Sequence, residues 1–370
     1  MSSIPLYPDR LEITPLSRPP RATVRVPGSK SITNRALVLG ALSDPNKGTK
    51  LRGALQSEDT EVMVDALRML GFRIQTDWAA GTIDIRRGPS ASPIPAKEAT
   101  LFLANSGTSM RFLTAMVSAG EGPYELDGVA RMRERPIADL LDALRRLGVD
   151  ARSANGAGFP PVIVEGRGSI FSDQPSKPVS GRVGIKGDMS SQFLSGLLMV
   201  APLARHSIFV QVNGRLVSPS YVAMTVRMMR DFGVEVATDG RTYFEIPVSP
   251  WYQGRVYDID PDASSASYFF AAAALTQGEV RVSELGKDSM QGDLAFVNLI
   301  YEMGCNVQRS DRHTHVKGWP LRGIDADMND ISDTVMTLAA VACFAEGPTT
   351  IRNVAHIRHK ETDRLAALAN

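Results

Sequence analysis

Cysteine is scarce in this sequence, and so are the patterns that mark metal-binding, secreted or membrane proteins. The two cysteines, Cys305 and Cys343, have no metal-ligand spacing, and the five histidines form no recognisable metal motif. Two cysteines are too few for a disulfide framework, and each is expected to be a small core residue. The longest apolar run, residues 336–345, is about half as long as a membrane span.

An excess of charge of one sign is also missing, because the formal net charge of the 370 residues is +1 at pH 7. Such a chain has no bulk attraction to nucleic acid or to a membrane, so any anion site must be local. Residues 1–20 lack an apolar signal core, and Asp9 and Glu12 argue against a transit peptide. With 43% hydrophobic residues, the sequence predicts a soluble globular protein of two or three domains in a reducing compartment, taken as the cytoplasm.

Five segments predict helices that are apolar on all sides and begin with small polar residues. They start at residues 29–31, 105–108, 190–192, 264–265 and 332–333, at intervals of about 70 to 85 residues. A helix that is apolar all round must be buried, and the capping residues at its start then face a crevice.

A second kind of helix is amphipathic and ends in glycine. The runs DALRMLG (residues 65–71) and DALRRLG (142–148) are near duplicates, and MMRDFG (228–233) and LIYEMG (299–304) echo them. Glycine is expected there because it adopts the left-handed conformation that commonly ends a helix. With short alternating strands between the helices, each unit of roughly 75 residues reads strand, buried helix, strand, surface helix, strands. Five such units begin in the sequence.

Residues 358–364 (RHKETDR) form the densest charge cluster, with six ionisable residues of both signs. The cluster follows a strand-like run, residues 349–354, and opens into a helical pattern at residues 365–368. The N–H groups at the start of a helix attract anions, and a carboxylate held between cations there could shuttle protons beside a bound anion. Taken alone, such a cluster is more often a solvated charge run, and it is the matching helix starts elsewhere in the chain that favour a site.

The fifth unit is unfinished in the sequence. Its surface helix begins near Thr362, and the glycine that should end it is expected at about position 374, beyond Asn370. Since a domain does not normally stop inside a helix, we expect the chain to be truncated at its C-terminus.

Six motifs, in one order along the chain, closely resemble 5-enolpyruvylshikimate-3-phosphate synthases. They are PGSKSITNRAL (27–37), LANSGTSMR (103–111), RMRERP (131–136), DASSASYF (262–269), SMQGD (289–293) and RHKETDRL (358–365). The resemblance covers essentially the whole chain. It implies an α/β fold with two domains of repeated βαβαββ units, an inside-out α/β barrel whose sixth unit this sequence lacks.

The resemblance also implies a domain division and a reaction. Residues 1–27 and 260–370 would form the first domain, incomplete at its C-terminal end, and residues 28–259 the second, with the active site in the cleft between them. The family transfers the enolpyruvyl group of phosphoenolpyruvate to the 5-hydroxyl of shikimate 3-phosphate and releases phosphate, in aromatic amino-acid (chorismate) biosynthesis. It uses no metal and no organic cofactor, and a monomer is expected.

The motifs carry over a set of site residues from the family. Lys30, Asp333 and Glu361 are expected to be catalytic, with Asp333 as the base for the 5-hydroxyl and Glu361 beside the enolpyruvyl methylene. Contacts with shikimate 3-phosphate are expected from Lys30, Ser31, Arg35, Ser190, Ser191, Gln192, Ser218, Tyr221, Asp333, His356 and Lys360. Contacts with phosphoenolpyruvate are expected from Lys30, Asn105, Gly107, Thr108, Arg131, Gln192, Glu361 and Arg364. Arg133 and Arg135 are left unassigned.

Three other functions share parts of this pattern. The sister transferase that acts on UDP-N-acetylglucosamine has a loop cysteine in its second unit, whereas no cysteine precedes Cys305 here. A phosphate-binding P-loop needs glycines where this chain has Ser29 and Val24, so that reading fails. The third is a truncated chain that binds shikimate 3-phosphate but turns over weakly, because the missing unit supplies two phosphoenolpyruvate ligands in the family.

Overall fold

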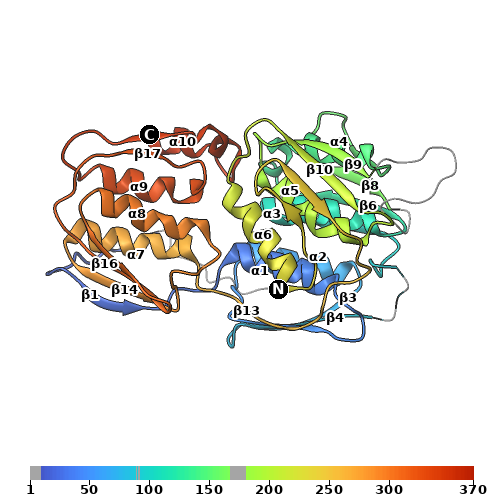
Figure 1. Ribbon diagram of the computed structural model, residues 1–370, viewed down its shortest axis with the longest axis horizontal. Helices are drawn as coiled ribbons and strands as arrows, with labels where there is room; N and C mark the ends of the chain where they lie inside the picture. The colour runs from blue at the N-terminus through green and yellow to red at the C-terminus, as the bar shows by residue number, and fades with distance from the viewer. Residues whose placement is uncertain (1–9, 89, 91, 167–180) are drawn as a thin grey trace. The chain divides into compact units, whose positions relative to one another are not determined.

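The computed structural model describes residues 10–88, 90, 92–166 and 181–370 (Figure 1). The chain divides into two compact units. Unit 1 consists of the N-terminal segment up to Ser29 together with Asp260–Val354, and unit 2 consists of Lys30–Ile259 together with Ala355–Asn370. Residues 355–370, which the sequence places in the first domain, thus cluster with unit 2; the domain boundaries themselves stay a prediction.

Unit 2 is built from three copies of one chain order. The first copy contains α1 (Lys30–Ala41), β2 (Thr49–Arg52), α2 (Glu58–Met69), β3 (Phe72–Asp77) and β4 (Thr82–Arg87). The second contains β5 (Ala99–Phe102), α3 (Gly107–Met116), β6 (Pro123–Asp127), α4 (Ala138–Arg146), β7 (Asp150–Ser153) and β8 (Val162–Glu165). The third contains β9 (Arg182–Lys186), α5 (Ser191–Val200), β10 (Ile208–Asn213), α6 (Pro219–Asp231), β11 (Ala237–Thr238) and β12 (Tyr243–Ile246).

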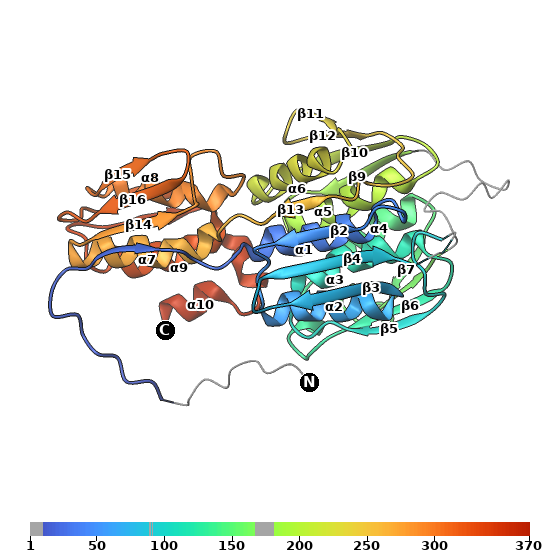
Figure 2. The same cartoon turned by 90° about the horizontal axis from the view of Figure 1, so that it is seen from below.

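The three sheets of unit 2 share one topology. Their strand orders are β13-β2-β4-β3, β5-β6-β8-β7 and β9-β10-β12-β11, where β13 is Val256–Asp258. In each sheet the first two strands are parallel and the others antiparallel. Strand β13 comes from the end of the unit and fills the first position of the first sheet (Figure 2). The predicted repeat of βαβαββ units is therefore confirmed.

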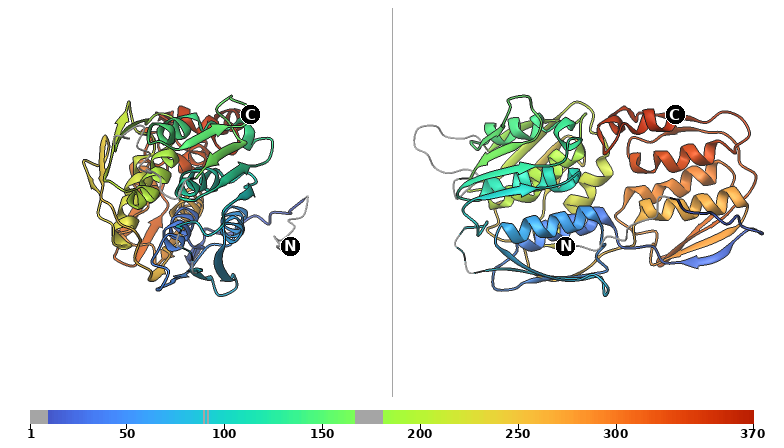
Figure 3. Two further views of the ribbon diagram at one scale, coloured as in Figure 1. Left: turned by 90° about the vertical axis from the view of Figure 1, so that its right-hand side faces the viewer. Right: turned by 180° about the vertical axis from the view of Figure 1, so that it is seen from behind.

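Three helices form the buried centre of unit 2. Residues 32–41 of α1 are all buried, and α3 and α5 are buried along nearly their whole length. Helix α3 packs against both α1 and α5, and the strands lie outside these helices (Figure 3). Their apolar composition on every side explains this position, because no face of such a helix can be left in water.

The amphipathic helices end as the glycine pattern predicts. Gly71, Gly148, Gly233 and Gly304 follow α2, α4, α6 and α8 (Phe296–Glu302), with φ values of 89°, 85°, 90° and 122°. A side chain at these angles would clash with the backbone, so glycine fixes where each helix stops and the next strand begins.

Unit 1 repeats the same order once and begins it again. Its first sheet is β1-β14-β16-β15, made of β1 (Arg21–Val24), β14 (Glu279–Ser283), β15 (Asn306–Arg309) and β16 (His313–Lys317), with α7 (Ala263–Thr276) and α8 between strands. Strands β17 (Asp325–Asp327) and β18 (Thr350–Arg352) form a parallel pair around α9 (Val335–Ala342).

Short 3-10 turns and one further helix complete the two units. Unit 1 contains η4 (Gly292–Ala295) and η5 (Ser332–Thr334). Unit 2 contains η1 (Val117–Ala119), η2 (Met132–Glu134), η3 (Ala201–Leu203), η6 (Ala355–His359) and α10 (Arg364–Ala369).

The prediction of complete burial is wrong for α7. Its Tyr268 and Phe269 are 62% and 40% exposed. Helix α7 packs on α8, α9 and the sheet, and these neighbours cover only part of its circumference, whereas α1, α3 and α5 are each packed between other helices of unit 2. Within the described parts of the chain, no helix is long and apolar enough to cross a membrane.

Candidate active site

The starts of the buried helices in unit 2 bring several predicted site residues together. Lys30 is the first residue of α1, and Ser190 caps α5 by accepting a 3.2 Å hydrogen bond from the N–H of Gln192. The side-chain amide of Gln192 donates to the hydroxyl of Thr108, on the first turn of α3, over 3.2 Å. The beginnings of α3 and α5 are thus joined by two polar side chains that the sequence assigns to substrate binding.

Arg35 lies in the core of unit 2 and is only 2% exposed. Its Nε donates to the Thr225 hydroxyl over 2.7 Å, and its Nη atoms donate to the carbonyls of Ser31 (3.0 Å) and Tyr221 (3.1 Å) and to the Ser195 hydroxyl (3.4 Å). Burial lowers the pKa of Arg35 to about 10, so the guanidinium stays charged at neutral pH.

Ser218 and His356 meet at the start of α6. Ser218 is buried and left-handed, with φ 49°, and Pro219 begins the helix directly after it. Its Oγ lies 3.4 Å from Nε2 of the buried His356 in η6. Both were predicted to bind shikimate 3-phosphate, and the structure places them in contact.

Arg131 anchors the charged segment that follows η6. Its Nη2 donates to the backbone carbonyls of Arg358 (3.1 Å) and Lys360 (3.2 Å), and its Nη1 pairs with Glu134 at 2.9 Å. These bonds join residues 358–360 to the second repeat, which is the physical reason that they cluster with unit 2. The predicted phosphoenolpyruvate ligand therefore also positions the segment that carries Glu361.

Glu361 is the carboxylate at the centre of this segment. Its Oε2 accepts from Nη2 of Arg364 at 2.7 Å, and its Oε1 lies 3.8 Å from Nη2 of Arg135. Partial burial acts to raise the pKa of Glu361, but the positive charges of Arg364, Arg135 and Lys30 outweigh it and hold the pKa at about 2. The sequence left open which effect would win; the geometry makes Glu361 an ionised carboxylate at neutral pH.

Arg135 and Asp59, which contact members of this cluster, were not among the predicted site residues. Arg135 is 2% exposed and donates to the carbonyl oxygen of Asn105 over 2.8 Å. Asp59, on α2, lies 3.5 Å from the Nζ of Lys30. The position of Arg135 in the RMRERP motif was the available indication of a role, but the motif alone does not distinguish its three arginines.

The remaining predicted residues are distributed over both units. Ser191 is buried on the first turn of α5, whereas Ser31, Tyr221 and Lys360 are half-buried in unit 2. Asp333 belongs to unit 1, where it is half-buried in η5. The cap position of α9 is occupied by the next residue, Thr334, which makes no side-chain cap hydrogen bond.

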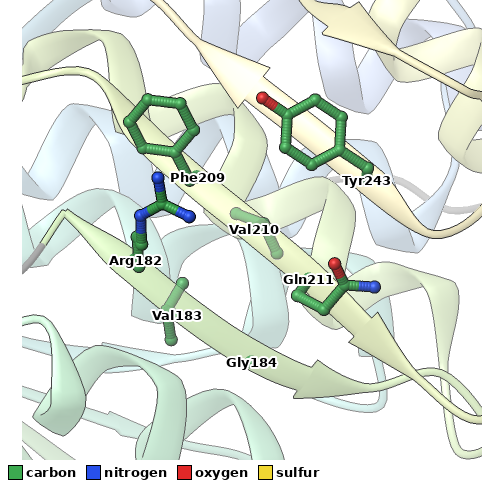
Figure 4. A pocket seen from close by; sticks show the side chains of 7 residues that line it. All are labelled: Arg182, Val183, Gly184, Phe209, Val210, Gln211 and Tyr243. Carbon is green, nitrogen blue, oxygen red and sulfur yellow. The ribbon is translucent and has the colours of Figure 1, made fainter.

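The described residues contain no group of histidine, cysteine, aspartate or glutamate side chains that could hold a metal ion. A hollow of ≈ 220 Å³ lies on the outer face of the third sheet, between β9, β10 and β12 (Figure 4). Arg182, Phe209 and Tyr243 are among its lining residues, and the Arg182 guanidinium lies 5.0 Å from the Phe209 ring centroid. None of the predicted site residues lines it, so this hollow is separate from the Glu361 cluster.

The fold is that of the enolpyruvyl transferases. A solved EPSP synthase from Acinetobacter baumannii matches with a TM-score of 0.76 and 26% identity, over 96% of this chain and 78% of that chain. An enolpyruvyl transferase from Streptomyces tendae, 20% identical, shares the fold with a TM-score of 0.67 over 91% of this chain and 75% of that one.

Sequence comparison narrows this class to one family. The family model for EPSP synthase (3-phosphoshikimate 1-carboxyvinyltransferase) matches residues 17–370. A 3-phosphoshikimate 1-carboxyvinyltransferase from Nostoc punctiforme is 48% identical over 97% of this chain and 82% of its own length. Another, from Paraburkholderia phytofirmans, is 43% identical over 97% of this chain and 81% of its own length. The chain belongs to the EPSP synthase family.

Proposed function

We propose that the chain transfers the enolpyruvyl group of phosphoenolpyruvate to the 5-hydroxyl of shikimate 3-phosphate, releasing phosphate, within aromatic amino-acid biosynthesis. Membership of the family supports the reaction. The observation that carries it is the ionised Glu361, held between Arg364 and Arg135 beside the starts of α1 and α3. Both substrates are polyanions, and such a cluster offers them fixed positive charge and one base.

The reaction needs two proton movements at the methylene carbon. In the addition step the 5-oxygen bonds to the carbon that bears the phosphate, its proton passes to a base, and the methylene gains a proton to become a methyl group. In the elimination step the methyl group loses a proton as the bond to phosphate breaks. Because Glu361 is ionised, we assign it the removal of that proton and assign the delivery of the first one to Lys30.

The other assignments follow the family resemblance. Asp333 is proposed as the base for the 5-hydroxyl. Ser190, Ser191, Ser218 and His356 are proposed to bind the 3-phosphate side of shikimate 3-phosphate, together with Ser31, Arg35, Tyr221 and Lys360. Asn105, Gly107, Thr108, Gln192, Arg131 and Arg364 are proposed for phosphoenolpyruvate. A monomeric state and a cytoplasmic location stay predictions from the same resemblance.

The test is phosphate release by the purified chain in the presence of both substrates, compared with a Glu361→Gln variant. Asp142→Asn is a matched control, because Asp142 forms the same kind of i,i+3 pair with an arginine, Arg145, at the surface of α4. Release that needs both substrates, is largely lost in Glu361→Gln and is kept in Asp142→Asn would support the proposal. Calorimetric binding of shikimate 3-phosphate without any release would instead identify a binding protein.

A further inference from the structure

Arg135 makes contacts in two directions from a buried position. Its Nη1 donates to the carbonyl of Asn105, which precedes Ser106, the N-cap residue of α3, and lies 3.5 Å from the Asn105 side-chain oxygen. Its Nη2 faces Oε1 of Glu361 at 3.8 Å. A planar guanidinium is suited to this, because its two ends can serve different partners while the plane stays fixed.

Gly107, the first residue of α3, has no side chain, and the Arg135 guanidinium fills the space beside it. A Cβ atom built on Gly107 would lie 2.1 Å from Nη2, 2.7 Å from Cζ and 2.9 Å from Nη1 of Arg135. These separations are far below ordinary van der Waals contact. The arginine thus occupies the space that any side chain at position 107 would need.

Charged groups from several elements surround Glu361. Arg364 lies on α10, Lys30 on α1, Arg111 on α3 and Arg135 after η2, and all four are cationic. Asp59 on α2 is a second acid, besides Glu361, whose charge acts on Arg135. Arg111 donates from Nη1 to the Gly107 carbonyl over 3.4 Å, whereas Arg135 bonds to the Asn105 carbonyl and has its other end 3.8 Å from the Glu361 carboxylate.

We propose that Arg135 is a positioning residue that fixes the start of α3 and the carboxylate of Glu361 relative to each other. Its guanidinium holds the Asn105 carbonyl with one end and faces Glu361 with the other, so the phosphoenolpyruvate contacts of Asn105 and Gly107 stay in register with the proton-transfer group. This inference rests on the proposed transferase function. It assigns Arg135 no contact with substrate.

Two substitutions separate the charge of Arg135 from its shape. Arg135→Gln removes the charge, and Arg135→Lys keeps the charge but loses the planar fork. Arg133→Gln is the matched control, because Arg133 lies two residues away and pairs with Asp127 at the surface. Three quantities are measured for each: the KM for phosphoenolpyruvate, the acidic limb of kcat/KM against pH, and the ¹³C NMR titration of the Glu361 carboxyl, identified as the resonance missing in Glu361→Gln.

Arg135→Gln is expected to move the Glu361 titration and the acidic limb upward by about one pH unit, the effect of losing one nearby cation. Arg135→Lys is expected to keep both near their wild-type positions yet to raise the KM for phosphoenolpyruvate about tenfold, the loss of one charge-assisted bond. Arg133→Gln should match the wild type in all three.

Several results would overturn the positioning role. One is an unshifted Glu361 titration in folded Arg135→Gln; another is full rescue of the KM by lysine. If Arg135→Gln does not fold, the Arg135→Lys KM alone decides, because that variant keeps the buried charge. If the wild type releases no phosphate, the transferase proposal fails, and the NMR titration still decides whether Arg135 acts on Glu361.

Discussion

Replacing Gly107 with alanine tests whether the start of α3 is built around Arg135. Gly107 is the first residue of the helix and is absent from the positive-φ glycines, so alanine suits its backbone. In a helix, alanine is favoured over glycine by up to about 1 kcal/mol. Propensity alone therefore predicts a small gain in stability.

The Arg135 guanidinium predicts the opposite sign. With a Cβ only 2.1 Å from Nη2, the guanidinium must retreat by roughly 1–1.5 Å to restore van der Waals contact. The 2.8 Å bond from Nη1 to the Asn105 carbonyl would then break. A hydrogen bond from a charged donor contributes about 1.5–3 kcal/mol, so we expect Gly107→Ala to lower the free energy of unfolding by about 1–2 kcal/mol after the helix gain is included.

The assay is urea denaturation of four proteins: the wild type, Gly107→Ala, Arg135→Ala and the double variant. Once Arg135 is shortened, the alanine at position 107 has space, and its cost should vanish or reverse to a small gain. Gly88→Ala is the control, because the nearest atom to its Cβ is Nε of Arg73 at an ordinary 3.8 Å. If Gly107→Ala costs the same with and without Arg135, the two effects are additive and the reasoning is refuted.

Three further predictions concern single residues. Because the pKa of Glu361 is held at about 2, below its value of about 4.3 in an unfolded chain, its ionisation favours folding above pH 4.3 or so. The stability difference between the wild type and Glu361→Gln should therefore shrink as pH falls from 5 toward 2, measured by urea unfolding at each pH; a constant difference would contradict this. Ser218→Gly should raise the free energy of unfolding by up to about 1 kcal/mol, since glycine adopts φ 49° without strain, while phosphate release falls through loss of the proposed ligand; a drop in thermal stability would be the contrary result. Arg35→Lys should lower the free energy of unfolding by about 2 kcal/mol or more, because one ammonium cannot satisfy four acceptors around a planar fork, and a wild-type urea midpoint would count against it.

The sequence predicts the repeating part of this fold well because its causes are local. A helix that is apolar on every side must be buried, and a glycine at a helix end needs no partner far along the chain. Those rules predict where the buried helices α1, α3 and α5 start. They also predict that the amphipathic helices end before Gly71, Gly148 and Gly233. The exposure of Tyr268 and Phe269 on α7 does not, because burial there depends on how many neighbours enclose the helix.

The site was predictable as a set of motifs but not as a set of contacts. No spacing rule indicates that Arg131 donates to carbonyls more than 200 residues away in the sequence, at Arg358 and Lys360. The ionisation of Glu361 was equally inaccessible, because it depends on a balance between burial and charges that three separate elements supply. Arg135 was unassigned for the same reason: its role lies in its distances from Gly107 and Glu361, not in its neighbours in sequence.

The buried arginines of unit 2 explain how a chain of net charge +1 can present a strongly local positive site. Surface arginines such as Arg52 and Arg133 are paired with carboxylates, which cancel their charge. The buried ones are held mainly by neutral groups: Arg35 by carbonyls and hydroxyls, and Arg135 by the Asn105 carbonyl. Neutral acceptors orient a guanidinium without neutralising it, and burial weakens solvent screening of its charge. The charge of Arg35 is therefore oriented by neutral acceptors, whereas the charge of Arg135 acts on Glu361, the only described carboxylate within 4 Å of it.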